Sequence, residues 1–79
     1  MISEDLRKII IKELQLNDSI ELNDNTSAND VPGWDSLKHI NIIVAIENHY
    51  NIKFKGLEIL RIKNLGDLQQ LIYKKESVK

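Results

Sequence analysis

Cysteine is absent from the 79-residue sequence, and proline and tryptophan occur once each. Without cysteine the chain has no disulfide, no thiolate metal ligand and no cysteine nucleophile. The two histidines, His39 and His49, are far apart in sequence and have no evident third ligand, so we expect no metal site. Small domains often depend on disulfides or bound metals for their stability. We therefore expect the packing of helices to stabilise this one.

An excess of charge of one sign is also missing. Lys and Arg total 11 against 12 Asp and Glu, which gives a net charge of −1. This balance gives no excess of positive charge that would favour the binding of a nucleic acid. No stretch is long and apolar enough to span a membrane, and Met1 leads into an amphipathic pattern instead of a leader pattern. We predict one small cytoplasmic domain over residues 1–79.

Apolar residues first recur at helical spacing near the N-terminus. Leu6, Ile9, Ile10 and Leu14 form one stripe behind Ser3, a suitable N-cap, and predict a helix over residues 4–16. The following segment, 17–32, is rich in Asn, Asp and Ser and predicts a long loop. Its singly spaced apolar residues favour a loop anchored on the bundle over a flexible linker. The expected anchors are Ile20, Leu22 and Val31.

A second helix is predicted up to residue 50, with Asp35 as its N-cap and Asn51 as its end. Its helical wheel carries two apolar stripes, whereas a surface helix needs only one. The first stripe suffices for burial and contains Ile42, Ile43, Ile46 and Tyr50. The second contains Leu37, Ile40 and Val44, and we interpret it as a partner surface in preference to plain core. Ser36 lies between the stripes at the N-terminal end.

The rest of the chain predicts two more helices. Residues 52–55 alternate apolar and charged side chains, but no second strand is evident, so we expect an extended connector. A short helix over 57–62 follows Gly56. A final helix begins at Asn64, with Asp67 in its first turn, and we expect residues 76–79 to fray. The predicted fold is all-α: a small four-helix bundle with three longer helices, one short helix and a long loop between the first and second.

The chemistry of Ser36 depends on its place at a helix N-terminus. A serine nucleophile needs a general base that a third group holds in position. Asp35 is too weak a base, and nothing in the sequence orients His39, one helical turn away. The free N–H groups and the positive dipole end of a helix favour an anion such as phosphate. Ser36 is therefore better placed to carry a phosphate ester than to catalyse a reaction.

The motif Asp35-Ser36-Leu37, which follows a turn and opens an Ile-rich helix containing Ile46-Glu47, resembles that of the acyl carrier proteins. The resemblance covers nearly the whole chain, from the first helix through the long loop to the final helix. It implies a carrier that is not an enzyme, with a 4'-phosphopantetheine arm attached to Ser36 by a phosphopantetheinyl transferase that uses coenzyme A. The thiol of the arm would hold acyl intermediates of fatty-acid, polyketide-like or other specialised biosynthesis as thioesters.

The resemblance also implies roles for the residues around Ser36. Asp35 would help to present the serine to the transferase, and His39 is a candidate contact for the phosphate. The acyl-loading and acyl-processing enzymes (synthases, ligases and transferases) would dock on this monomeric carrier. Their expected contacts are Leu37, Lys38, Ile40 and Val44. The expected contacts of an acyl chain sheltered between the helices are Ile46, Phe54 and Ile62.

The helix after Ser36 differs from that of common fatty-acid carriers, which is strongly acidic. Here the first turns carry Lys38 and His39, and Glu47 is the only carboxylate of the helix. The form of the motif that begins with Trp34 looks more like that of carriers in specialised pathways, and Trp34 fits either a packing lid or a partner contact. Two alternatives stay open. One is an amino-acyl or peptidyl carrier, such as a D-alanyl carrier, and the other is an unmodified helical interaction module.

Overall fold

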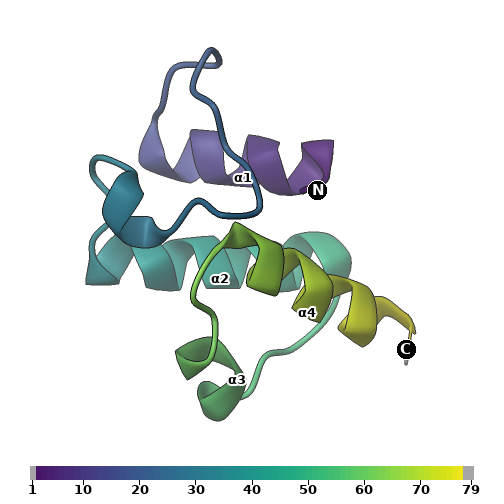
Figure 1. The fold of residues 1–79 in the computed structure, drawn as a ribbon. Helices are drawn as coiled ribbons and strands as arrows, with labels where there is room; N and C mark the ends of the chain where they lie inside the picture. The colour runs from purple at the N-terminus through teal and green to yellow at the C-terminus, as the bar shows by residue number, and fades with distance from the viewer. Residues whose placement is uncertain (1, 78–79) are drawn as a thin grey trace.

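A computed structural model describes residues 2–77, which form four α-helices and one short 3-10 helix (Figure 1). Their order is α1 (Glu4–Leu14), η1 (Ala28–Asp30), α2 (Ser36–Tyr50), α3 (Gly56–Leu60) and α4 (Leu65–Ser77). In Figure 1, α1 lies above α2 and runs in the opposite direction, α4 crosses in front of α2, and the short α3 lies below them. This arrangement confirms the predicted all-α bundle. No helix in the described part of the chain is long and apolar enough to cross a membrane.

The first helix begins as predicted and ends earlier. The Ser3 hydroxyl accepts the N–H of Leu6 at 3.2 Å, which is the expected N-cap bond. The predicted end at residue 16 is wrong, because α1 stops at Leu14. Gln15 takes the left-handed conformation (φ 55°), and its N–H returns to carbonyls of the last turn. A left-handed residue of this kind terminates an α-helix.

The last helix, in contrast, continues past its predicted end. Glu76 and Ser77 belong to α4 and do not fray. The hydroxyl of Ser77 donates to the carbonyl of Lys74 at 2.9 Å and so helps to hold the final turn. Residues 78 and 79, which we also expected to fray, lie outside the described residues.

Ile and Leu side chains from the three longer helices make the core. The most deeply buried of them are Leu6, Ile10, Ile42, Ile46, Leu68 and Ile72. Full burial of one such side chain is worth about 1.5–3 kcal/mol. The first stripe of α2 is thus core, as predicted, although Tyr50 at its end is only half-buried. These contacts stabilise a domain that has no disulfide.

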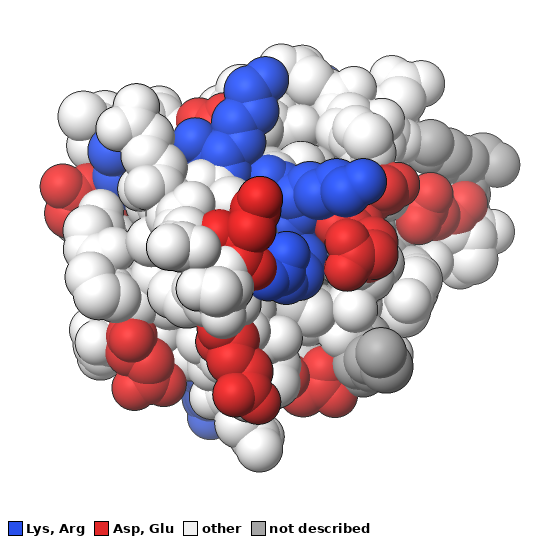
Figure 2. Space-filling view, turned by 90° about the horizontal axis from the view of Figure 1, so that it is seen from above, with Lys and Arg blue, Asp and Glu red and all other residues white. Residues whose placement is uncertain are grey.

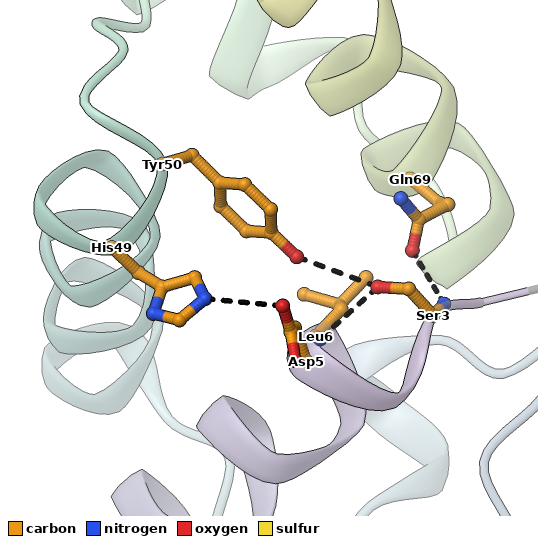
Figure 3. Close-up of polar contacts among 6 residues, drawn as sticks. All are labelled: Ser3, Asp5, Leu6, His49, Tyr50 and Gln69. Atoms are coloured by element: carbon orange, nitrogen blue, oxygen red, sulfur yellow. Dashed lines mark hydrogen bonds and ion pairs between the residues drawn. The ribbon is translucent and has the colours of Figure 1, made fainter.

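A small polar network joins the start of α1 and the end of α2 to Gln69 on α4 (Figure 3). The backbone N–H of Ser3 donates to Oε1 of the buried Gln69 on α4 at 2.7 Å, and the Ser3 hydroxyl lies 3.4 Å from that of Tyr50 on α2. Beside them, Nε2 of His49 lies 3.3 Å from Oδ2 of Asp5. Burial raises the pKa of the Tyr50 phenol above 10.0. The network fixes the start of α1 against α2 and α4.

The long loop between α1 and α2 is anchored on the bundle, as predicted. Leu22 and Val31 are buried, and Ile20 is half-buried against the core. The guanidinium of Arg7 on α1 donates to the carbonyls of Asp18 and Ile20. Charged side chains of both signs are interleaved on the face formed by α1 and this loop, which Figure 2 shows from above. The loop is therefore held by apolar anchors and by hydrogen bonds from the Arg7 side chain to its carbonyls.

The same loop caps the start of α4. The N–H of Leu65 donates to the carbonyl of Thr26 at 2.8 Å, and that of Gly66 donates to the carbonyl of Asp24 at 2.9 Å. Helix N-termini leave such N–H groups without an intrahelical partner. Gly66 permits this close approach, because a Cβ atom there would lie 3.0 Å from the Asp24 carbonyl oxygen. The loop is thus tied to α1 and to α4 before it reaches α2.

Candidate functional site

A Pro-Gly turn leads from the long loop to the start of α2. Val31 is buried, and its carbonyl accepts the N–H of Trp34 across the turn at 3.3 Å. Proline at the second position and a glycine with φ +83° at the third are what a type II turn requires. Residues with a side chain rarely adopt the conformation of Gly33. The turn places the next residues at the surface.

Asp35 is the N-cap of α2, as predicted. Its Oδ1 atom accepts the N–H of Lys38 at 2.8 Å, and its carbonyl accepts the N–H of His39 at 2.9 Å. Ser36 follows as the first residue of the helix and is exposed. The cap fixes the backbone on which the serine sits. The hydroxyl is therefore presented to solvent from an ordered helix N-terminus.

Trp34 and His39 form a pair beside this serine. The indole Nε1–H of Trp34 donates to Nδ1 of His39 at 3.2 Å, and the ring centroids are 6.1 Å apart. Because Nδ1 accepts this bond, it is not available to take the proton of Ser36. Among residues 2–77, no group of three or more His, Asp or Glu side chains is placed to hold a metal ion. The geometry fits a modification site better than a catalytic one.

The second apolar stripe of α2 is exposed. The exposed fractions of Leu37, Ile40 and Val44 are 65%, 59% and 46%. Leu57 and Leu60 of the neighbouring α3 are also exposed, at 70% and 80%. Our sequence reasoning did not select these two leucines, because a five-residue helix is too short to show a periodic stripe. Together the five side chains expose apolar surface on both α2 and α3.

A cavity of about 260 Å³ lies between α2 and α3. Its lining residues are His39, Ile40, Ile43, Val44, Glu47, Phe54 and Ile59. Of the three predicted contacts of an acyl chain, only Phe54 lines it. Ile46 is fully buried in the core instead, because it lies one turn after Ile42 on the core stripe. Ile62 lines a separate cavity of about 50 Å³ against Leu65 and Leu68 at the start of α4.

Two carboxylates hold the elements around the larger cavity. Oε2 of Glu47 accepts the N–H of Phe54 at 2.8 Å and so ties the connector to α2. Oε1 of Glu58 on α3 accepts the N–H of Lys55 at 2.8 Å and pairs with Nζ of Lys75 on α4 at 2.7 Å. The hydrogen bond from Lys75 is the largest of the effects that keep the pKa of Glu58 below its ordinary value. These bonds fasten α3 over the cavity.

The sequence matches the model of a family described as "Phosphopantetheine attachment site" over residues 4–72. The structure is similar to the solution NMR structure of a holo acyl carrier protein from Geobacter metallireducens, with 44% sequence identity and a TM-score of 0.88. The similarity covers 95% of this chain and 85% of that one. The chain belongs to the acyl carrier protein family. A search of curated proteins found no match.

The cofactor of this acyl carrier protein is a covalently attached 4'-phosphopantetheine. An arm joined through a phosphate ester needs an exposed hydroxyl with open space beside it. Ser36 is exposed and lines an open groove of about 460 Å³. The start of α2 also offers the backbone N–H groups and dipole that favour a phosphate. The residues of this acyl carrier protein therefore fit the cofactor.

Proposed function

We propose that this acyl carrier protein holds acyl groups as thioesters on a 4'-phosphopantetheine arm attached to Ser36. The observation that carries the proposal is the placement of Ser36 within the family match: an exposed serine at the first turn of α2, directly after the capping Asp35. The carrier would act as a cosubstrate that moves between enzymes. A cytoplasmic location and a monomeric state stay predictions from the sequence.

In the attachment reaction, the Ser36 oxygen would form a bond to the pantetheine phosphorus of coenzyme A, and adenosine 3',5'-bisphosphate would leave. The base that accepts the serine proton would come from the phosphopantetheinyl transferase, since Nδ1 of His39 is occupied by Trp34. Asp35 would act as a positioning residue, because its carboxylate holds the first turn of α2. The arm, once attached, supplies the thiol on which the acyl group is carried.

Partner enzymes would dock on the exposed stripe of α2. Leu37, Ile40 and Val44 would supply apolar contacts next to the attachment serine, and Lys38 would supply a charged contact. All partners must reach Ser36, and this stripe begins one residue after it. Such a position fits a surface that every partner uses. The exposed Leu57 and Leu60 would extend it onto α3.

The charge around this docking surface favours acidic partner surfaces. Residues 36–63 contain five Lys and Arg against two Glu, a net charge of +3. Both carboxylates are engaged within the fold, Glu47 with the connector and Glu58 with Lys75. Complementary charge governs the choice of partner and the association rate. The variant Lys38→Glu should change the salt dependence of modification by a transferase, while Lys8→Glu on α1 should leave it unaltered. Equal effects of both variants would contradict this docking surface.

The lining of the cavity between α2 and α3 favours an acyl cargo over an amino-acyl one. Five of its lining side chains are apolar: Ile40, Ile43, Val44, Phe54 and Ile59. Burial of hydrocarbon in such a space is favourable by about 25 cal/mol per Å² of apolar surface. A charged amino group gains nothing from these five side chains, and the one carboxylate of the lining, Glu47, already accepts the N–H of Phe54. We therefore propose a fatty-acid-like or polyketide-like cargo from specialised biosynthesis, with the D-alanyl type as the second candidate.

Intact-mass measurement tests the proposal. The purified apo protein is incubated with coenzyme A, Mg²⁺ and a broad-specificity phosphopantetheinyl transferase. We expect the wild type to gain the mass of one phosphopantetheine group and Ser36→Ala to gain none. Ser19→Ala, which removes an exposed serine of the long loop, is the matched control and should be modified like the wild type. A folded wild-type protein without any mass gain would favour the unmodified interaction module instead.

A further inference from the structure

The groove beside Ser36 contains more than the attachment serine. Its lining residues are Ala28, Trp34, Asp35, Ser36, His39 and Ile40. They come from η1, from the end of the long loop and from the first turns of α2. The groove is separate from the cavity between α2 and α3, although His39 and Ile40 line both. An arm on Ser36 therefore has two separate spaces within reach.

The hydrogen bond between Trp34 and His39 determines which proton His39 carries. An indole N–H is only a donor, so Nδ1 of His39 must be an unprotonated acceptor. In the neutral imidazole the one remaining proton is then on Nε2. Trp34 thus keeps His39 as a hydrogen-bond donor through Nε2–H. This donor belongs to a side chain that lines the groove.

Apolar residues near the start of α4 lie beside the two rings. Trp34 and His39 line the small cavity of about 50 Å³ together with Ile62, Leu65 and Leu68, which connect them to the core. Trp34 itself is half-buried and packs against that core. A wall that is ordered in advance lowers the entropic cost of binding. The pair therefore has the properties of a preorganised binding surface.

We propose that this groove is a resting site for the pantetheine arm, with Trp34 and His39 as its binding wall. The inference rests on attachment of the arm to Ser36. The arm offers a phosphate, two amides and a geminal dimethyl group. His39 Nε2–H would donate to a phosphate or amide oxygen, while Trp34 and Ile40 would pack against the dimethyl group. A short tether gives an effective concentration in the millimolar range, so weak contacts suffice.

Trp34 makes the proposal measurable, because it is the single tryptophan of the chain. The holo protein is prepared with the transferase, its mass is checked, and the nuclear Overhauser effects between the dimethyl protons and the Trp34 ring are recorded. We expect these effects in the wild type, together with a shift of the indole N–H resonance between apo and holo protein. Their loss is expected in His39→Phe, which keeps a ring and removes the donor. His39→Gln, which restores a donor, should recover them.

The outcomes separate this inference from the function on which it rests. Absence of the mass gain would contradict both the proposed attachment of the arm and the resting site. A confirmed mass gain with no dimethyl-to-Trp34 effect and an unchanged indole resonance would overturn the resting site alone. Wild-type effects that persist unchanged in His39→Phe would overturn the role of His39. If His39→Phe fails to fold, the comparison of apo and holo wild type still decides whether the arm lies in the groove.

Discussion

Replacement of two helical glycines by alanine should change stability in opposite directions. Gly66 lies in the first turn of α4 and Gly56 in the first turn of α3. Alanine at either position restricts the unfolded chain and favours a helix, which by itself stabilises a protein by about 0.4–1 kcal/mol. The surroundings of the two glycines differ. A Cβ atom at position 56 would have no neighbouring atom within 4 Å, whereas Gly66 faces the long loop.

The expected loss at Gly66 follows from the contacts of the loop. A Cβ atom would lie 3.0 Å from the carbonyl oxygen and 3.1 Å from the Cβ of Asp24, so the loop must move. That movement weakens the bond from the Gly66 N–H to Asp24, and the neighbouring bond from Leu65 to Thr26. A hydrogen bond contributes about 0.5–1.5 kcal/mol, and an unsatisfied donor costs about 1–3 kcal/mol. After the alanine gain is subtracted, Gly66→Ala should lower the free energy of unfolding by about 1 kcal/mol.

Thermal unfolding followed by circular dichroism measures both variants. For a domain of this size, 1 kcal/mol corresponds to a Tm change of about 4–8 °C. We expect Gly66→Ala to melt lower than the wild type and Gly56→Ala to melt slightly higher. If Gly66→Ala were as stabilising as Gly56→Ala, the loop would not cap α4 as described.

Three further predictions concern the core, a phenol and the attachment of α3. Ile46→Ala should lower the free energy of unfolding by about 2–5 kcal/mol, whereas Leu37→Ala, at an exposed site, should change it by less than about 0.5 kcal/mol. Equal losses of stability in urea unfolding would contradict the different burial of the two side chains. Because burial raises the pKa of the Tyr50 phenol, the neutral phenol stabilises the fold fully below pH 10, and this contribution is lost as the pH rises through the folded-state pKa. The wild type should therefore lose more stability in that pH range than Tyr50→Phe, and identical pH profiles of the two proteins would argue against this. Lys75→Met removes the ion-pair partner of Glu58 and should speed amide hydrogen exchange in α3 but not in α1. Unchanged exchange in α3 would show that the ion pair does not hold α3 in place.

The helices were predictable from the sequence because their signals are local, although the short helix predicted over residues 57–62 spans Gly56–Leu60 in the structure. The caps at Ser3 and Asp35 and the left-handed end at Asn51 depend on residues within one turn, and the structure has all three. The end of α1 was placed too late, because Leu16 continues the apolar pattern after Gln15 has left the helix. Periodicity identifies an apolar residue, but it does not show where the backbone changes conformation.

Contacts between distant segments were not predictable in the same way. A helical wheel shows that Ile46 and Val44 lie on different faces of α2, but not that Val44 borders a cavity against α3. The capping of α4 by loop carbonyls joins residues about forty positions apart and has no sequence signature. The bond from Trp34 to His39 spans five positions, yet it depends on the Pro-Gly turn that orients the indole. Ser36 was identified because its motif is local.

Ser36 is the residue that we propose to carry the arm. The most direct test is fragmentation mass spectrometry of the tryptic peptide spanning residues 13–38 from the modified protein. This peptide contains three serines, Ser19, Ser27 and Ser36, so its fragments distinguish them. We expect the phosphopantetheine mass on the fragment that contains Ser36 and not on those that contain only Ser19 or Ser27. Phosphopantetheine on either of the loop serines, or on a peptide elsewhere in the chain, would contradict it.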